Sequence, residues 1–338
     1  MATNNRIFYA CQAVNIMQSG TPTATSGGTV KGVQSLGMSA NFTLDQVFEM
    51  GQLEIYENIE DVADIEVTLE KVIDGDKFIW EFASNNLCRT TLAGAAKNRC
   101  DVYLAIYDDA TDNATGNPRN VCYNSGMYTS SVSYSYSIDG SATESVTLVG
   151  NERFWNAETG PTDTTATAKF NNAATGFDED TPADNVQRRV NVDLEDGATA
   201  LPEIVTSQMN PDTPDDEDGI GGSYHIQSIS VSADFGQENI LELGRFGPYA
   251  RYATFPIEVT TEFEVISTSG DLQNVSGNGP NLTNQPIRIK DQAGTILDCG
   301  IKNKLSSVSY SGADTGGGNA TVSYSFSNFN NLTVTSGA

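Results

Sequence analysis

Residues 33–42 read VQSLGMSANF, and residues 226–235 read IQSISVSADF, so the chain carries this stretch twice. Further matches follow in the same order and with similar spacing: EMG and ELG at 49–51 and 242–244, IEVT at 65–68 and 257–260, and SSVSYS at 130–135 and 306–311. Blocks that recur in one order at one spacing indicate a duplicated domain rather than chance. The chain is therefore expected to contain one unit built twice.

The repeat sets the expected organisation of the 338-residue chain. We expect an N-terminal segment at 1–29, a first copy at 30–156, an acidic polar connection at 157–222 and a second copy at 223–338. Each copy has the usual size of an independent domain. An apolar content of 38% suffices for β-domains that bury one face of each sheet. Two copies imply two separate cores.

The local pattern in both copies is that of β-strands. Residues 131–138 and 321–326 alternate small polar with apolar residues, which predicts strands with one buried face and an outward serine face. Residues 66–70 and 258–265 are predicted strands with carboxylates on their open face. The predicted fold class is mainly β: two tandem related β-barrel or β-sandwich domains, each with at most one short flanking helix.

That helix is predicted in the first copy at residues 85–97, with Asn85 or Asn86 as its cap and an apolar stripe along one side. In the second copy the corresponding stretch, 281–288, is shorter and contains Pro286, so the helix there is expected to be reduced or missing. Within the polar connection, residues 186–194 (VQRRVNVDL) form one strand-like piece. It is either an arm that pairs with a sheet edge, on this or a neighbouring chain, or an ordinary surface loop.

The formal net charge of −26 is the second strong feature. Such a chain should repel nucleic acid, because binding requires cations that replace counterions along the phosphates. One interpretation is solubility or adaptation to a salty habitat. The other is a surface past which another polyanion travels without sticking.

No catalytic, cofactor-binding or metal site is predicted. The only histidine, His225, has Gly32 as its counterpart in the other copy and stands in no nucleophile motif. One histidine cannot supply a usual zinc ligand set. Asp212 and the acidic cluster Asp215–Asp218, followed by Gly219, match only a fragment of a calcium loop, so a calcium site there is a weak hypothesis. Of the two tryptophans, Trp80 lies in an apolar run and is expected in the core. Because the chain is rich in carboxylates, a pair of them acting on a carbohydrate is the alternative to having no catalytic site.

The five cysteines, Cys11, Cys88, Cys100, Cys122 and Cys299, are odd in number and lack paired spacing. This argues against a disulfide framework and favours buried thiols. Cys122 and Cys299 both precede the repeated SSVSYS block and are expected in two separate cores. The sequence has no apolar stretch of membrane-spanning length and no signal-peptide profile at its start, so the chain is expected to fold inside a cell.

The first copy, from Gln34-Ser35-Leu36-Gly37-Met38-Ser39-Ala40-Asn41-Phe42 through residues 46–60 (QVFEMGQLEIYENIE) to 64–75 (DIEVTLEKVIDG), resembles the tail tube (major tail) proteins of tailed bacteriophages. The resemblance covers both repeats but not the acidic connection. It implies a small β-barrel or sandwich with a flanking helix, assembled head to tail into rings that stack into a hollow tube for DNA. The family has no catalytic residues to carry over.

A fused pair of tube domains implies a ring of three chains with pseudo-sixfold symmetry, and a six-chain ring is the alternative. The implied location is the virion tail after synthesis in the host cytoplasm. The implied partners are further copies, tail sheath, tape measure and baseplate proteins, with DNA passing unbound and no membrane contact. Glu66, Glu70, Glu258 and Glu262 are expected to line the lumen or an exposed sheet face. The rival functions are another virion component (baseplate, neck or head decoration), a cell-surface adhesin and a carbohydrate-active enzyme.

Overall fold

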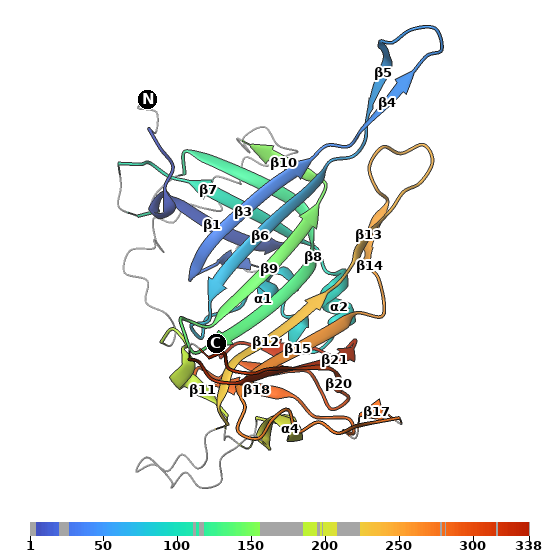
Figure 1. Ribbon diagram of the computed structural model, residues 1–338. Coiled ribbons are helices and arrows are strands. Elements are labelled where there is room, and N and C mark those ends of the chain that lie inside the picture. The colour runs from blue at the N-terminus through green and yellow to red at the C-terminus, as the bar shows by residue number, and fades with distance from the viewer. Residues whose placement is uncertain are drawn as a thin grey trace.

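The computed structural model shown in Figure 1 describes residues 5–19, 27–110, 113–114, 118–155, 185–194, 197, 199–207, 224–277, 279–280, 282–315 and 317–337. Within these residues the chain is mainly β, as the alternating patterns predicted. None of the helices in this part of the chain is long and apolar enough to cross a membrane.

One antiparallel sheet runs through the whole molecule, in the order β3-β6-β9-β8-β12-β15-β21-β20. The first half supplies β3 (Val33–Asn41), β6 (Asp64–Val72), β9 (Thr143–Gly150) and the C-terminal part of β8 (Asn120–Ser137). The second half supplies β12 (Ile226–Asp234), β15 (Glu258–Ile266), β21 (Thr321–Phe329) and β20 (Lys304–Ser311). Among the described strands this sheet is open, with β3 and β20 at its two ends, so the barrel alternative for the fold is replaced by an open main sheet.

Shorter strands form a second layer. In the first half these are β2 (Gly27–Thr29), β1 (Gln12–Gln18), β7 (Cys100–Ile106), the N-terminal part of β8, and β10 (Glu152–Trp155). In the second half they are β11 (Val192–Asp193), β18 (Arg288–Asp291), β19 (Ile296–Asp298) and β22 (Thr333–Thr335). Each layer packs on the apolar side of the main sheet, which gives the sandwich its core.

The remaining elements are hairpins and short helical turns. The hairpins are β4 (Leu44–Phe48) with β5 (Ile55–Glu60), β13 (Gln237–Ile240) with β14 (Ala250–Ala253), and β16 (Val275–Ser276) with β17 (Gly279–Pro280). The turns are the 3-10 helices η1 (Tyr9–Cys11) and η3 (Arg189–Asn191), and α4 (Glu203–Thr206).

The predicted single helix at 85–97 is wrong in its extent. The structure instead has α1 (Ile79–Ala83), the 3-10 turn η2 (Leu87–Arg89) and α2 (Leu92–Lys97). Asn85 and Asn86 follow α1 with left-handed backbone angles, φ of 52° and 62°, and Asn86 precedes η2 as its N-cap residue without a side-chain capping hydrogen bond. The cap belongs to Thr91, whose side chain accepts a hydrogen bond from the Gly94 N–H. In the second half the described residues between 282 and 288 form no helix.

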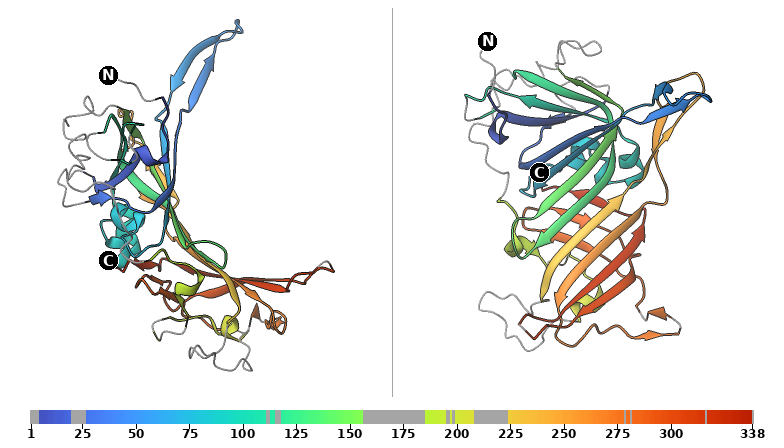
Figure 2. Two further views of the ribbon diagram at one scale, coloured as in Figure 1. Left: turned by 90° about the vertical axis from the view of Figure 1, so that its left-hand side faces the viewer. Right: turned by 45° about the horizontal axis from the view of Figure 1, so that its top comes forward.

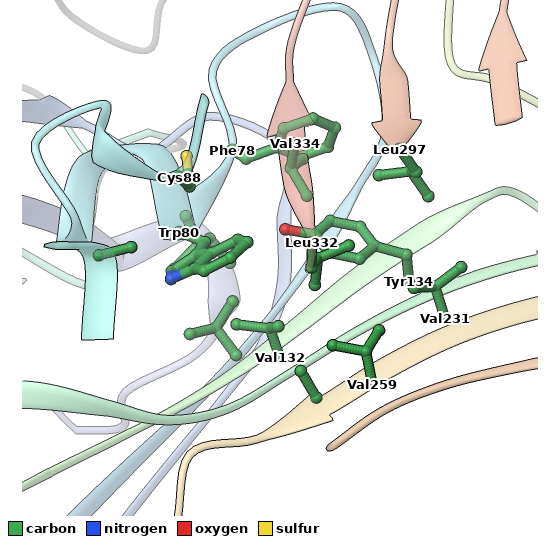
Figure 3. Close-up of a cluster of buried hydrophobic side chains, with 14 of the residues drawn as sticks. Phe78, Trp80, Cys88, Val132, Tyr134, Val231, Val259, Leu297, Leu332 and Val334 are labelled. Carbon is green, nitrogen blue, oxygen red and sulfur yellow. The ribbon is translucent and has the colours of Figure 1, made fainter. Parts of the chain in front are cut away.

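One continuous core serves both halves, which corrects the expectation of two. Cys122 and Cys299 belong to the same cluster of buried residues. At its centre the ring of Trp80 lies 5.7 Å from that of Phe235, and Leu332 and Val334 approach from the C-terminal strand (Figure 3). The halves share a core because they share a sheet: β8 pairs directly with β12. The expectation of buried thiols is confirmed, since all five cysteines are free and buried.

Polar contacts also join the halves. The Tyr136 hydroxyl on β8 donates to Asp291 Oδ2 on β18 at 3.1 Å. Glu81 on α1 accepts from Arg89 Nε at 2.6 Å and from the Ser336 backbone N–H at 3.1 Å. The helices of the first half therefore hold the C-terminal strand of the second.

The strand-like piece at 186–194 pairs with a sheet edge of its own chain. Val192 and Asp193 lie opposite Asp291 and Lys290 of β18. In the second half β11 pairs with β18, and in the first half β1 pairs with β7 in the same way. The strands β1 and β11 therefore have equivalent positions. Of the two tryptophans, Trp80 is fully buried as expected, and Trp155 on β10 is partly exposed.

Candidate functional surface

The two sides of the main sheet differ in chemistry. On β6 the side chains of Ile65, Val67 and Leu69 enter the core, and on β8 those of Val132 and Tyr134 do so. The intervening residues point away from the core, as the period of two requires. We call this outward side the serine–glutamate face. Most of its residues carry hydroxyls, and its carboxylates are Asp64, Glu66, Glu70, Asp234, Glu258, Glu262 and Glu264.

The four glutamates singled out in the sequence lie on this face. Glu66, Glu258 and Glu262 are exposed, and Glu70 is partly exposed and accepts from the Ser35 hydroxyl at 3.2 Å. Among the described strand residues on this side, one cation occurs, Lys304 at the start of β20. Its ammonium donates to the Leu282 carbonyl at 2.7 Å. The face therefore presents negative charge and hydroxyls to solvent.

The serine–glutamate face is concave. In the left view of Figure 2 the main sheet bends as it passes from the first half to the second, and helices α1 and α2 lie on its convex side. The core lies on the helix side, so the polar side faces into the bend. A sheet bent in this way is one sector of a curved wall, and its negative side is the inner one.

Both ends of this wall are strand edges. Among the described residues β3 pairs only with β6, and β20 pairs only with β21. Soluble proteins usually protect such edges with charges, prolines or a covering element. The β3 strand from 33 to 41 has no charged residue, and β20 has only Lys304. Tyr310 on β20 is 53% exposed, whereas its repeat counterpart Tyr134 is fully buried.

Two hairpins extend from the same side of the sheet, where one connects β3 to β6 and the other connects β12 to β15 (Figure 1). The β4–β5 hairpin projects away from the body and exposes many large apolar side chains, namely Leu44, Val47, Phe48, Met50, Leu53, Ile55, Tyr56 and Ile59. The β13–β14 hairpin is anchored at its base, where Gln237 Nε2 donates to the Thr129 carbonyl at 2.8 Å and Arg251 contacts Asp64 at 3.2 Å. Its tip also exposes Leu241, Leu243 and Phe246. Apolar surface of this extent marks a protein-contact site.

His225 has a backbone role. It precedes β12 with φ of 53°, and Gly32 precedes β3 with φ of 71°. The His225 carbonyl accepts from the Ile266 N–H at 3.0 Å, and the Gly32 carbonyl accepts from the Val72 N–H at the same distance. The two residues therefore make the same bend before equivalent strands.

The weak calcium hypothesis at Asp215–Asp218, together with Asp212 and Gly219, lies outside the described residues. Within the described ranges no group of three or more His, Cys, Asp or Glu side chains is arranged to hold a metal ion.

Glu144 is one of several buried carboxylates that the sequence did not reveal. Glu144 on β9 is fully buried and accepts from the backbone N–H groups of Ile79 at 2.7 Å and Trp80 at 3.2 Å, and from the Tyr134 hydroxyl at 3.1 Å. Desolvation raises its pKa to about 7, although these hydrogen bonds act in the opposite direction. The alternation could have revealed it, because Glu144 is in phase with the buried Val146 and Leu148.

Glu144 makes the stability of the fold depend on pH. Folding raises the pKa of Glu144 from 4.5 to about 7. The contribution of Glu144 to the free energy of unfolding is therefore fully present below pH 4.5, the pKa in the unfolded chain. It is lost as the pH rises through about 7, the pKa in the folded chain. Glu144→Gln keeps an oxygen acceptor for the Ile79 N–H and does not titrate. Between about pH 4.5 and 8 we expect wild type to lose about 3 kcal/mol of unfolding free energy relative to this variant. Urea unfolding of both proteins at the two pH values measures this. Parallel pH profiles would show that Glu144 is ionised throughout.

Comparison with known proteins gives matches in structure only. A scan against protein-family models finds no match, and a search of curated protein sequences finds none either. Among solved structures, the anti-feeding prophage baseplate matches with 11% identity and a TM-score of 0.32, covering 46% of this chain and 97% of that one. The anti-feeding prophage cap that terminates its tube matches with 14% identity and a TM-score of 0.33, covering 46% and 93%.

A third match is the sheath–tube complex of the PVC extracellular contractile injection system, with 13% identity, a TM-score of 0.32, and coverage of 45% of this chain and 91% of that one. These three structures are parts of contractile injection systems. Each alignment spans almost the whole neighbour and just under half of this chain. At these scores the likeness carries no information on function.

Proposed function

We propose that this chain is a structural, non-enzymatic subunit of a phage-type tail, which assembles into rings that stack into a hollow tube for DNA. The observation that carries the proposal is the continuous bent sheet with a negative hydroxyl-rich inner side and two open edges that together carry one charged residue, Lys304. A wall of this kind is completed by adding further copies at its edges. The resemblance of residues 34–75 to tail tube proteins points the same way. The proposed location is accordingly the virion tail, after synthesis in the host cytoplasm.

We further propose that the two halves are copies of one domain, with copies at 30–156 and 223–338 joined by the acidic connection. Supporting this, the strand orders β3-β6-β9-β8 and β12-β15-β21-β20 correspond. The repeated blocks fall on corresponding strands, except EMG and ELG, which fall in the loops of the β4–β5 and β13–β14 hairpins. Bulges also recur at matching places, between Val33 and Ser35 and between Ile226 and Ser228. The correspondence of β1 with β11 extends the repeat to the segments that precede each copy.

The negative inner side fits a conduit. DNA in a channel lined by Glu66, Glu70, Glu258 and Glu262 meets like charge and hydroxyls, so it is confined without being gripped. Three chains would give six domains per ring, and six chains would give twelve. We favour three, with tail sheath, tape measure and baseplate proteins as further partners at the hairpin tips and the ring faces.

Electron microscopy of the purified chain tests this function. Hollow rings or open-ended tubes with three-fold or six-fold end views are the expected result, and the views give the number of chains in a ring. Single closed rings that never stack would favour a baseplate or neck component. Compact monomers at every concentration, also after addition of a tail initiator complex, would contradict the proposal, as would particles without a central channel.

Charge reversal on the inner side tests the conduit separately. Replacing Glu66, Glu70, Glu258 and Glu262 with lysine should leave assembly intact, because these side chains are solvent-facing and not in the core. Assembled variant particles are expected to retain duplex DNA at about 50 mM salt and to release it at about 200 mM, since each phosphate contact adds about −0.9 to the salt slope. Wild-type particles should retain none at either salt concentration. The matched control reverses four exposed carboxylates that lie outside the strands of this face and outside the hairpins, Asp139, Glu152, Glu203 and Asp314. Equal retention by both variants would argue against a charged lumen.

A further inference from the structure

The chain already contains one junction between its two halves. There β8 pairs antiparallel with β12, with Ser133 opposite Ser232 and Tyr134 opposite Val231. At one end of the junction the Phe235 N–H donates to the Ser130 carbonyl at 2.8 Å. Both strands are built from the repeated blocks: SSVSYS begins at Ser130, and the block ending in Phe235 forms β12.

The second copies of these same blocks form the two open edges. The other SSVSYS block, 306–311, lies on β20, and the counterpart of β12 is β3. One chain thus offers at its ends the two surfaces that already fit each other in its middle. We propose that β20 of one chain pairs with β3 of a second copy in the register of the internal junction. This inference rests on the proposed self-assembly and adds the surfaces and the register. The predicted opposed pairs are Ser307 with Asn41, Val308 with Ala40, Ser309 with Ser39, Tyr310 with Met38, and Ser311 with Gly37.

The backbone groups are directed for this pairing. In an antiparallel pair, hydrogen-bonded and non-hydrogen-bonded pairs alternate. The bonds from Phe235 N–H to Ser130 O and from Ile138 N–H to Gln227 O fix the alternation, so Tyr134 and Val231 also form a hydrogen-bonded pair. Tyr310 is the repeat counterpart of Tyr134, so its backbone N–H and C=O point to the open edge of β20. Met38 does the same on β3.

The side chains at the two edges match those of the internal junction. Tyr134 and Phe235 are fully buried, whereas their counterparts Tyr310 and Phe42 are 53% and 71% exposed. A second copy in the proposed register would cover both rings. It would also place the Phe42 N–H at the Ser306 carbonyl, as Phe235 lies at Ser130.

The distribution of charge also favours a second copy of this chain as the partner of the β3 and β20 edges. A chain of net charge −26 repels its own copies, and edges that must stay single usually carry charge. The paired positions on β3 and β20 instead carry only hydroxyl, amide, thioether, aromatic and aliphatic groups or no side chain. The contact is head to tail, because β20 and β3 are different surfaces at opposite ends of the sheet. With the bend of Figure 2 continued through each junction, repeated pairing follows a closed curve.

Disulfide trapping tests the register. Ser39 and Ser309 form a non-hydrogen-bonded pair in the proposed register, which brings Cα atoms to about 4.5 Å and within disulfide range. The variant Ser39→Cys with Ser309→Cys, oxidised with diamide, is expected to give a ladder of covalent multimers that reductant collapses. Mixing the two single variants should give covalent dimers only. The native thiols are buried, and burial raises the pKa of Cys88 and of Cys299 to about 12, so they contribute little background.

The matched control is Asn41→Cys with Ser311→Cys. Both residues are exposed and lie on the same side of the same two edge strands. In the proposed register they are offset by four residues, about 13 Å along the strand, beyond disulfide reach. We expect at least about tenfold less cross-linking than for the test pair. Rings in the microscope with cross-linking of the control pair, or of neither pair, would overturn the register while leaving the proposed function standing. Absence of any self-association at all would overturn both.

Discussion

Replacing Tyr310 with proline is expected to weaken assembly strongly while the single chain stays folded. Its N–H faces the open edge of β20, so proline there removes no bond to β21, and edge positions of this kind tolerate proline. In the proposed contact the variant loses one hydrogen bond of about 1 kcal/mol and the burial of a ring worth about 2 kcal/mol. The association constant should fall about 100-fold. Sedimentation velocity over a concentration series measures it.

Tyr310→Thr is the matched control, because threonine removes the ring but keeps the N–H donor and favours strands. An intermediate loss, about 30-fold, is expected for this control. At concentrations too low for assembly, the thermal unfolding transitions of all three proteins should coincide, since Tyr310 lies outside the buried core. If Tyr310→Pro assembles like wild type, the contact between chains does not use the β20 edge.

Trp80→Ala is expected to be the most destabilising single truncation in the core, at about 3–5 kcal/mol. Trp80 is fully buried and its ring lies 5.7 Å from Phe235, so the cavity would open where the two halves meet. Its indole N–H has no hydrogen-bond partner among the described residues, so Trp80→Phe should cost less, about 1–2 kcal/mol. Urea denaturation followed by circular dichroism measures both losses.

The second tryptophan provides the control. Trp155 is 46% exposed on β10, so Trp155→Ala should change stability by less than about 1 kcal/mol. Because the chain has two tryptophans, this variant also makes Trp80 the only indole fluorophore. Its emission then reports directly on the junction of the halves. We expect one cooperative transition by fluorescence and circular dichroism, because one core serves both halves. Two separate transitions would mean that the halves unfold independently.

Much of the sheet could be read from local sequence. Alternation placed strands at 66–70, 131–138, 258–265 and 321–326, because a residue's side of a strand depends only on its parity. The same parity placed Glu66 and Glu258 on the open face. The same alternation places Glu144 and Lys71 on the buried side of their strands, together with apolar neighbours. Their burial was not predicted because both side chains are charged.

The prediction of a single helix at 85–97 is wrong because tertiary packing requires a turn at its start. Asn85 and Asn86 are plausible caps by residue type, but the chain must turn sharply after α1 to seat Trp80 and Cys88 in the core. Both asparagines adopt the left-handed region that this turn requires. A cap residue and a turn residue have the same composition, so the sequence could not separate them.

The sequence by itself determined the strand-rich class, the repeated blocks, the negative charge and the side of the sheet on which that charge lies. These properties depend on residue type, order and parity alone. Only the tertiary structure decided that the halves share one sheet and one core, and that β3 and β20 are left open at its ends. Strand pairing and packing join residues far apart in the chain, such as Tyr134 with Val231 and Trp80 with Phe235. No local pattern specifies which of several equivalent edges meet, because that choice depends on the total area each arrangement buries.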